Sequence, residues 1–551
     1  MVKKQSKKKV ANRKAASKAG KESRPRDMVT DLHSPAALEN FRDIFRFHGE
    51  RPRGSDFHPA STLFEGRFGR MFRTLPPAEF AEEDLKALAA AMIAEHEAIP
   101  TPETEDDDEE NQGISAGYTY LGQFIDHDLT FDPASSLQKQ NDPDALEDFR
   151  TPRFDLDCLY GRGPNDQPYI YEDKGVRMLR GRRLTGNPHD RRSHDLPRNS
   201  PAPRGRARAL IGDPRNDENV IVSQLQSTMQ RFHNRVVDFL TRNTGTAPEF
   251  EQVQRAVRWH YQWVVLHDFL PTIAGQDVVD KVLPHLKNKT SIRVDKPNLA
   301  FFHWEKIPFM PIEFSAAVYR FGHSMVRPIY RLNTTVDRKE IFSIADEKNS
   351  LTGFRALPSN FAIDWSLFFN MGGAPPQGPE RLQKSYKIDT SLVNPLGNLP
   401  EVIGANVPSL AERNLIRGWR MGLPSGQTVA RYMDAEVIPD EKLLVGKAIV
   451  IKPPDKPNKP ITEISTKFAG NAPLWFYILA EAQQGFDGNN ATPIRLGPVG
   501  GRIVAEVFIG LLLGDQYSFL SQDPSWKPFK EFTTTEDEFG MAELIKQALK
   551  A

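Results

Sequence analysis

The sequence predicts a mainly α-helical protein that forms one large domain with few short strands and long loops. Apolar residues recur at the spacing of one helix face over residues 77–96, 220–241, 250–268, 312–326 and 473–484. Alternating patterns typical of strands are few and short, and the proline-rich residues 453–460 cannot be helical. No internal repeat divides the 551 residues. We therefore expect one helical core, although the chain exceeds the usual size of a single domain.

The composition is that of an ordinary soluble protein. Hydrophobic residues make up 39% and charged residues 26% of the chain, and the formal net charge is zero. No general attraction to nucleic acid or membranes follows from this balance. Cys158 is the only cysteine, so an intrachain disulfide and a cysteine-rich metal site are excluded. The apolar run 503–513 contains Glu506 and is too short to span a bilayer, which favours a core helix.

Three segments of biased composition surround the expected helices. Residues 1–28 are basic and predict a disordered tail ahead of a domain over 29–551. This tail can be a solvated arm or a surface for nucleic acid or anionic lipid. It lacks the apolar stretch of a signal peptide, so a cytoplasmic location is expected, with non-classical export left open. The acidic residues 103–110 predict a solvated loop, and the arginine-rich residues 176–208 predict a long exposed excursion.

Residues 122–133, with the sequence GQFIDHDLTFDP, hold the most informative cluster of polar side chains. On a helix, Gln123 and His127 lie one turn apart on the same face, and Asp126 and Asp128 flank the histidine. Such a face can carry a base, a hydrogen-bond partner and two anionic anchors. Taken alone, the same pattern also fits a solvated acidic helix end.

Other motifs follow in a fixed order. They are LIGDPRNDE at 210–218, RFHNR at 231–235, YRFGHSMVRP at 319–328 and RGWRMGLP at 417–424. Together with residues 122–133 they resemble the distal helix, the Gly-Asp-x-Arg segment, the proximal-histidine segment and the Gly-Leu-Pro segment of the animal haem peroxidase superfamily. The resemblance runs from about residue 115 to 435, and it implies a helical haem peroxidase domain.

Peroxide cleavage on haem requires a base that moves a proton between the two oxygens and a positive group near the departing oxygen. It also requires an axial nitrogen ligand on the other face of the iron. The resemblance implies that His127 is the distal base, that Arg215 stabilises charge and that Gln123 positions peroxide or water. His323 falls at the position of the proximal iron ligand. His233 is expected to be a helix-packing residue.

The resemblance also implies partners for the proximal histidine. Gln427 is expected to accept the second ring N–H of His323, in the place of an asparagine in mammalian relatives. Arg320 is expected to pair with a haem propionate; the alternative is a surface arginine. Haem fatty-acid dioxygenases carry a tyrosine close before the proximal histidine, whereas Tyr319 lies one position further away, which favours a peroxidase.

Asp126 and Glu218 match the two carboxylates that form ester bonds to haem methyl groups in mammalian members, so haem b, ester-linked or not, is the expected cofactor. Asn219 replaces the methionine that forms a sulfonium link in myeloperoxidase. We therefore expect a less oxidising haem that prefers iodide, bromide, thiocyanate or aromatic donors to chloride.

A calcium site is the second implied cofactor. Asp128 matches the first ligand of the family, and residues 151–157 match the loop that completes the site. Hydroxyl, carbonyl and carboxylate oxygens, the hard ligands that calcium prefers, are expected from Thr151, Arg153, Asp155 and Asp157. The last of these is a serine in the mammalian loop, so Asp157 adds negative charge that strengthens cation binding.

The predicted function is that of a haem peroxidase, which reduces hydrogen peroxide and oxidises small donors, halides or thiocyanate through a high-valent haem state. A haem-dependent fatty-acid dioxygenase on the same scaffold is the first alternative. A non-enzymatic adhesion or binding protein is the second. The sequence does not specify the electron donor, the halide preference, covalent attachment of haem or the oligomeric state.

Overall fold

The structure is a computed structural model. It describes residues 68–95, 108–130, 150–172, 174–200, 206–305, 307–372, 381–404, 407–451, 457–488, 493–536 and 538–551. The tail expected at 1–28 and the domain boundary after it lie outside these residues.

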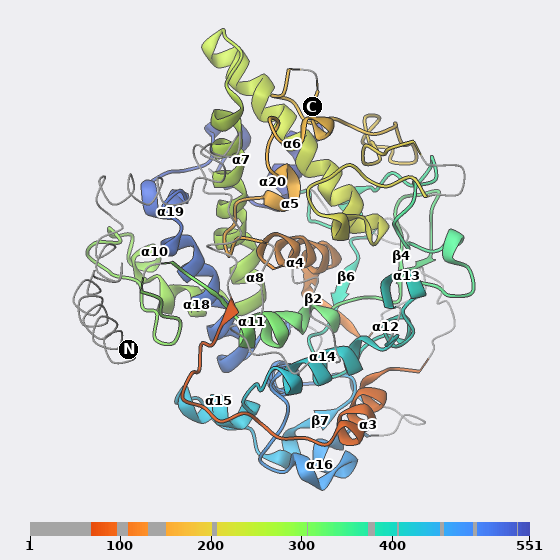
Figure 1. The fold of residues 1–551 in the computed structure, drawn as a ribbon, viewed down its shortest axis with the longest axis vertical. Coiled ribbons are helices and arrows are strands. Elements are labelled where there is room, and N and C mark those ends of the chain that lie inside the picture. The colour runs from red at the N-terminus through yellow and green to blue at the C-terminus, as the bar shows by residue number, and fades with distance from the viewer. Residues whose placement is uncertain are drawn as a thin grey trace, which may run out of the picture. The chain divides into compact units, whose positions relative to one another are not determined.

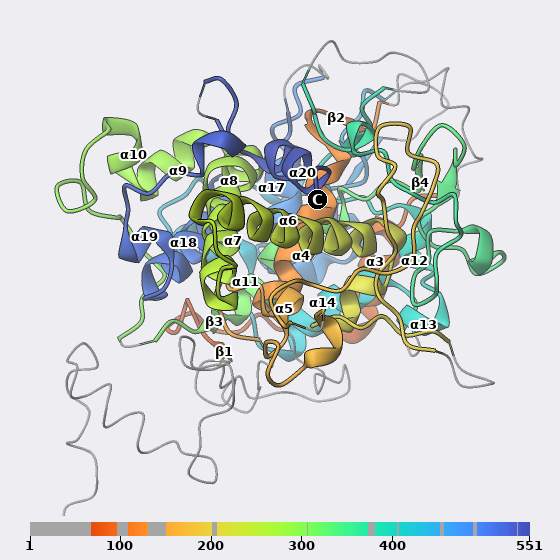
Figure 2. The same cartoon turned by 90° about the horizontal axis from the view of Figure 1, so that it is seen from above.

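Long helices surround helix α4 (Ala116–Leu129), which lies near the middle of the described fold (Figures 1 and 2). Helix α6 (Val220–Thr244) crosses α4, and α7 (Phe250–Val264) and α20 (Met541–Ala548) pack against α6. Helix α18 (Pro498–Gly514) packs against α8 (Leu270–Ala274) and α17 (Leu474–Gln483). The mainly α-helical fold predicted from the sequence is thus confirmed.

Shorter helices complete the described fold. The α-helices are α3 (Glu82–Met92), α5 (Asp157–Tyr160), α9 (Gln276–Val282), α10 (Pro284–Asn288), α11 (Ile312–Ala316), α12 (Asn394–Gly397), α13 (Glu401–Gly404), α14 (Leu410–Arg420), α15 (Gly426–Tyr432), α16 (Ile461–Ile464) and α19 (Phe519–Gln522). The 3-10 turns are Pro168–Ile170, Pro214–Asp217, Val318–His323, Glu347–Asn349, Trp365–Leu367, Asp440–Lys442, Thr466–Phe468 and Lys530–Phe532, and Val265–Phe269 is a π-helical turn.

The strands are short and pair in twos. Strand β1 (Phe68–Gly69) runs parallel to β3 (Met310–Pro311). The other pairs are antiparallel: β2 (Glu110–Ser115) with β6 (Lys384–Tyr386), β4 (Ile329–Tyr330) with β5 (Lys339–Glu340), and β7 (Leu444–Val445) with β8 (Lys459–Pro460). The β2–β6 pair has an irregular register between Glu110 and Ser115 and leads directly into α4.

Helix α6 illustrates how local sequence fixes an element near the site. The Asn219 side chain caps its first turn by accepting the N–H groups of Ile221 and Val222 at 3.0 and 2.9 Å. Gly245 ends the helix with φ of 74°, a left-handed conformation that glycine adopts without strain. With 25 residues, the helix is about 37 Å long at 1.5 Å per residue, so it reaches from the site to α20.

Two helical predictions differ in detail from the structure. The stretch 250–268 contains the π-helical turn, and the stretch 312–326 divides into α11 and the 3-10 turn Val318–His323. The apolar run at 503–513 lies in α18, where the buried Glu506 accepts the N–H groups of Ala300, Phe301 and Phe302. These three hydrogen bonds explain why a carboxylate can be buried in a core helix. In the described part of the chain, no helix has the length and apolarity needed to cross a bilayer.

The prediction that the acidic segment 103–110 is solvated is wrong at its end. Glu110 is 3% exposed and forms ion pairs with Arg327 and Arg381, at 2.7 and 2.8 Å. Because β2 pairs with β6, its first residue is carried inward to these two arginines. In the excursion at 176–208, the arginines 182, 183, 191 and 192 are exposed, whereas Asp190 and Asp195 are buried.

Candidate active site

Helix α4 places His127 in a buried position with one defined hydrogen-bond partner. Its Nδ1 atom lies 2.7 Å from Oδ1 of Asn216, and Nδ2 of Asn216 donates to Oε1 of Gln226 at 2.9 Å. Burial, together with the nearby charge of Arg215, lowers the pKa of His127 to about 4. The imidazole is therefore neutral near pH 7. Because Asn216 presents a carbonyl oxygen, the proton lies on Nδ1 and Nε2 carries the lone pair.

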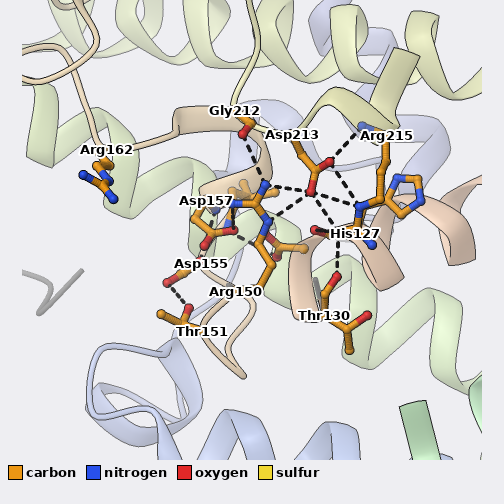
Figure 3. A network of polar contacts seen from close by, with 12 residues as sticks. His127, Thr130, Arg150, Thr151, Asp155, Asp157, Arg162, Gly212, Asp213 and Arg215 are labelled. Atoms are coloured by element: carbon orange, nitrogen blue, oxygen red, sulfur yellow. Dashed lines mark hydrogen bonds and ion pairs between the residues drawn. The ribbon is translucent and has the colours of Figure 1, made fainter. Parts of the chain in front are cut away.

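Arg215 lies beside His127 and is fixed by several contacts (Figure 3). It belongs to the 3-10 turn Pro214–Asp217, which Asp213 caps by accepting the Arg215 backbone N–H at 2.8 Å. Its Nη2 donates to Asp213 at 2.8 Å, to the His127 carbonyl at 3.1 Å and to the Thr130 carbonyl at 2.5 Å. The structure therefore places Arg215 next to the backbone of His127, and the catalytic roles of the two residues stay predictions.

Gln123 and Glu218, two further predicted site residues, contact each other. The Gln123 Nε2 donates to the Glu218 carboxylate, and its Oε1 accepts from Nδ2 of Asn219 at 3.0 Å. Burial raises the pKa of Glu218 to about 7. The role of Gln123 in positioning peroxide stays a prediction, and the structure adds two side-chain partners that the sequence did not reveal.

His323 ends the 3-10 turn Val318–His323, and its Nδ1 lies 2.8 Å from the side-chain amide of Asn414 in α14. Burial lowers the pKa of His323 to about 3, so the ring is neutral and able to bind a metal ion. The amide nitrogen of Asn414 faces the ring in this structure. A half-turn of the amide presents its oxygen instead, as a ring that carries a proton on Nδ1 requires.

The prediction that Gln427 supports His323 is wrong. Gln427 is the second residue of α15, where its Nε2 donates to Asp440 at 3.1 Å and its Oε1 accepts the Ala472 N–H at 2.8 Å. Asn414 takes the supporting position because it lies on α14, the helix that precedes the Gly-Leu-Pro turn. A signal existed in the sequence: an asparagine three residues before Arg417 shares a helix face with it. In the structure Asn414 is only 1% exposed.

Arg320 is partly buried and lies close to the site, which excludes the surface alternative. In a 3-10 turn, residues three apart lie on the same face, so Arg320 and His323 share one face of the turn Val318–His323. Its Nε donates to the Ser315 carbonyl at 2.9 Å. Burial lowers its pKa, which the charge of Asp126 raises and the charge of Arg215 lowers. Burial also lowers the pKa of Arg413, a half-buried residue of α14, whereas the charge of Glu218 raises it.

These contacts test whether the residues fit a haem group. Within the described residues, neither Arg320 nor Arg413 forms an ion pair with a carboxylate at hydrogen-bond distance. Two partly desolvated guanidinium groups without such a partner suit the two propionates of a haem. The neutral imidazoles of His127 and His323 come from two elements, α4 and the proximal turn, that pack against each other. The residues present therefore fit the group.

Tyr319 joins the proximal turn to α4. Its ring stacks on Phe314 with a centroid distance of 4.8 Å, and its hydroxyl donates to the Gly122 carbonyl at 3.3 Å. The side chain is 7% exposed. Its hydroxyl is therefore engaged by backbone one residue before Gln123.

The expected calcium ligands include a tight carboxylate cluster. Oxygens of Asp128, Asp155 and Asp157 lie within 4.8 Å of one another. Oδ1 of Asp128 is buried without a hydrogen-bond partner, and burial together with Asp155 raises the pKa of Asp128 to about 8. Thr151 donates its hydroxyl to Asp155 at 2.7 Å. Two buried acids and one partly buried acid in this arrangement fit a divalent cation with oxygen ligands.

The side chain of Arg153 is directed to an acid outside the expected cation ligands. Its guanidinium points to Asp515, with Nε 3.8 Å from the carboxylate. Only its backbone carbonyl remains as a ligand to a cation, which agrees with the alternating pattern of the loop.

Residues 150–357 match the family model of the animal haem peroxidases. The matched stretch contains the cation loop, Arg215, Glu218, Arg320 and His323. Residues 150–357 belong to the animal haem peroxidase family. The family generally binds haem, and the chain has a mostly helical haem peroxidase fold. His127 and Asn414 lie outside the matched stretch. In the structure they contact Asn216 and His323, which lie inside it.

Similar solved structures extend the likeness beyond this stretch. Peroxidase A from Dictyostelium discoideum has 16% sequence identity and a TM-score of 0.52, over 88% of this chain and 93% of that chain. A fatty acid alpha-dioxygenase from Oryza sativa has 14% identity and a TM-score of 0.47, over 88% of this chain and 84% of that chain. One from Arabidopsis thaliana has 14% identity and a TM-score of 0.44, over 86% and 74%. No curated protein sequence matches the chain.

Proposed function

We propose that this protein is a haem peroxidase that reduces hydrogen peroxide and oxidises small electron donors or halides. The observation that carries the proposal is the hydrogen bond between Asn216 and Nδ1 of His127. It leaves Nε2 free to accept a proton, while the Arg215 guanidinium donates to the backbone carbonyl of the same residue at 3.1 Å. A neutral base next to a cation is the pair that peroxide cleavage requires.

Bound haem supplies the iron and the redox equivalents of the reaction. The distal residues handle protons and charge. Nε2 of His127 would accept a proton from one oxygen of the peroxide and return it to the other oxygen, which would leave as water. Arg215 offers positive charge as the outer oxygen departs. Its contacts to Asp213 and to the carbonyls of His127 and Thr130 hold the guanidinium in place before the substrate arrives.

The proximal residues hold the haem and its ligand ring. His323 would hold the haem iron through a ring nitrogen, and Asn414 would fix the orientation of the imidazole through Nδ1. Arg320 and Arg413 would bind the propionates. Asp126 and Glu218 would be the carboxylates for ester bonds to the haem, and the contact with Gln123 holds the Glu218 carboxylate in place. The cluster around Asp128 and Asp155 binds calcium and, because Asp128 follows His127 in the chain, braces the base.

Peroxidase activity is favoured over fatty-acid dioxygenation by the position of Tyr319. A radical-forming tyrosine needs its hydroxyl directed toward the substrate. The Tyr319 hydroxyl instead donates to the Gly122 carbonyl, and Arg320 occupies the face of the 3-10 turn above His323. The substrates we propose are iodide, bromide, thiocyanate and aromatic donors, because Asn219 caps α6 and bonds Gln123 where a sulfonium-forming methionine would sit.

Rapid mixing of the haem-loaded protein with hydrogen peroxide tests the proposal. The wild type should change its Soret absorption within milliseconds to seconds, and a donor such as iodide should restore the starting spectrum. His127→Ala should retain haem but slow the change at least a hundredfold, whereas His323→Ala should alter the resting spectrum. His233→Gln is the matched control, because His233 is a buried histidine that contacts Tyr160 and the Val176 carbonyl.

Three outcomes would contradict the proposal. The first is a purified protein that shows no Soret band after incubation with haem. The second is a His127→Ala variant that reacts with peroxide as fast as the wild type. The third is oxygen uptake with a polyunsaturated fatty acid that is lost in a Tyr319→Phe variant, which would instead assign the dioxygenase function.

A further inference from the structure

Arg150 lies between the carboxylate cluster and Arg215 and is 8% exposed (Figure 3). Its Nε and Nη2 donate to Oδ2 of Asp213 at 3.0 and 2.7 Å. Nη2 also donates to the Gly212 carbonyl at 3.2 Å. On its other side, Nη1 lies 3.5 Å from Oδ1 of Asp157. One guanidinium therefore contacts both the cation cluster and the residue that anchors Arg215.

Asp213 is shared by two guanidinium groups. The carboxylate is fully buried, and its Oδ2 accepts from Arg150 and from Nη2 of Arg215, the latter at 2.8 Å. Its Oδ1 accepts the Arg215 backbone N–H at 2.8 Å and Nε at 3.2 Å. Because a carboxylate has a limited number of lone-pair directions, the position of Arg150 restricts the position of Arg215.

The backbone between these groups is in close contact, so the arrangement is rigid. A Cβ atom at Gly212 would lie 2.5 Å from the Asp157 carbonyl oxygen and 2.6 Å from that of Cys158. Only glycine permits this approach of the Gly-Asp-x-Arg segment to the cation loop. A shift of the loop that carries Asp157 is therefore transmitted to Asp213 by direct backbone contact as well as through Arg150.

We propose that Arg150 is a positioning residue that holds Asp213 against Arg215 and also neutralises part of the cation cluster, so that the distal arginine and the cation site are linked through one side chain. This inference rests on the proposed function for the role of Arg215. Asp157 is the third acid of the cluster. Arg150 lies beside Asp157, so its positive charge and a bound cation compete for the same carboxylate. Cation binding and the geometry of Arg215 then influence each other by linkage.

Fluoride binding to the ferric, haem-loaded protein reports the position of Arg215 without turnover. Fluoride accepts hydrogen bonds from a correctly placed guanidinium. Arg150→Met should raise its Kd about tenfold, and Arg150→Lys should raise it several-fold, because lysine retains the charge but lacks the two-pronged contact with Asp213. Arg231→Met is the control: Arg231, on α6, forms a buried ion pair with Asp190, and its loss should leave the fluoride Kd unchanged.

A double-mutant cycle decides whether Arg150 acts through Asp213. If it does, the variant that combines Arg150→Met with Asp213→Asn should bind fluoride no more weakly than Asp213→Asn alone. Effects that multiply, or a fluoride Kd unchanged in Arg150→Lys and Arg150→Met, would overturn the assignment. An equal loss in Arg231→Met would also overturn it, because the effect would then be a general loss of stability.

Calcium titration of the protein without haem is a second test, and the calcium affinity that it measures does not depend on the proposed function. Removal of the charge near Asp157 in Arg150→Met should tighten calcium binding at least threefold, and Arg150→Lys should bind calcium as the wild type does. Weaker or unchanged calcium binding in Arg150→Met refutes the link to the cluster. A wild type that binds haem, fluoride and calcium but does not react with peroxide would reject the proposed function and leave these comparisons valid.

Discussion

The contact between His127 and Asn216 leads to a quantitative prediction. Asn216→Leu keeps the side-chain volume but removes the oxygen that accepts the Nδ1–H of His127 at 2.7 Å. An unsatisfied buried donor costs about 1–3 kcal/mol. If that energy is what selects the productive tautomer, its loss slows proton abstraction by about 5- to 150-fold, since 1.4 kcal/mol corresponds to a factor of ten. Rapid mixing with hydrogen peroxide measures this rate.

Two comparisons make the test specific. In the His127→Ala background, Asn216→Leu should have no further effect on the rate, because Asn216 acts only through the imidazole. Asn111→Leu is a control for the loss of a buried asparagine, since Asn111 bonds the N–H and the carbonyl of Ile494 at 2.8 Å. The reasoning is refuted if Asn216→Leu reacts as fast as the wild type, or if it slows the reaction equally with His127 absent.

Three further predictions concern the proximal side, the pH dependence and the cation. Asn414→Leu should raise the haem reduction potential, because a His323 imidazole that no longer donates from Nδ1 gives less electron density to the iron, whereas Gln427→Ala should leave the potential unchanged in a redox titration. The folded-state pKa of Glu218 is raised from 4.5 to about 7, so the folded protein binds a proton more tightly there. The group therefore destabilises the fold progressively as pH rises from about 4.5 to 7, by at most about 3 kcal/mol. Glu218→Gln should flatten this part of the stability–pH curve in denaturant unfolding; an unchanged slope would contradict the assignment. Chelation of calcium should lower the unfolding temperature of the wild type, and Asp128→Asn should abolish this sensitivity to chelator in thermal scans.

The sequence predicted the elements with strong local signals. Apolar periodicity located α6, α7 and α17. The resemblance to the haem peroxidases indicated His127, Arg215 and His323, and α4 packs against both of the 3-10 turns that carry the other two residues. Partners set by tertiary packing were not predictable in this way. Asn216 contacts His127 only because the 3-10 turn Pro214–Asp217 docks on α4.

The errors have the same physical origin. The sequence predicted Gln427 and did not indicate Asn414, because motif order does not show which side of the Gly-Leu-Pro turn faces His323. Glu110 resembled a solvated acid because its partners, Arg327 and Arg381, are more than 200 residues away in the chain. The 3-10 turn before His323 was also missed, since its apolar spacing is close to that of an α-helix.

The hydrogen bond from Tyr319 to Gly122 joins residues 197 positions apart, and this separation has a consequence for biogenesis. His127 and Asn216 are 89 positions apart, and His323 and Asn414 are 91 apart. Contacts this distant form late in folding, since a large chain entropy is lost before they are made. A nascent chain that ends before α14 lacks the Asn414 support for the ligand ring. We expect ribosome-bound chains to hold haem poorly until that helix, Leu410–Arg420, is made, so haem binding should begin only after most of the chain has been synthesised.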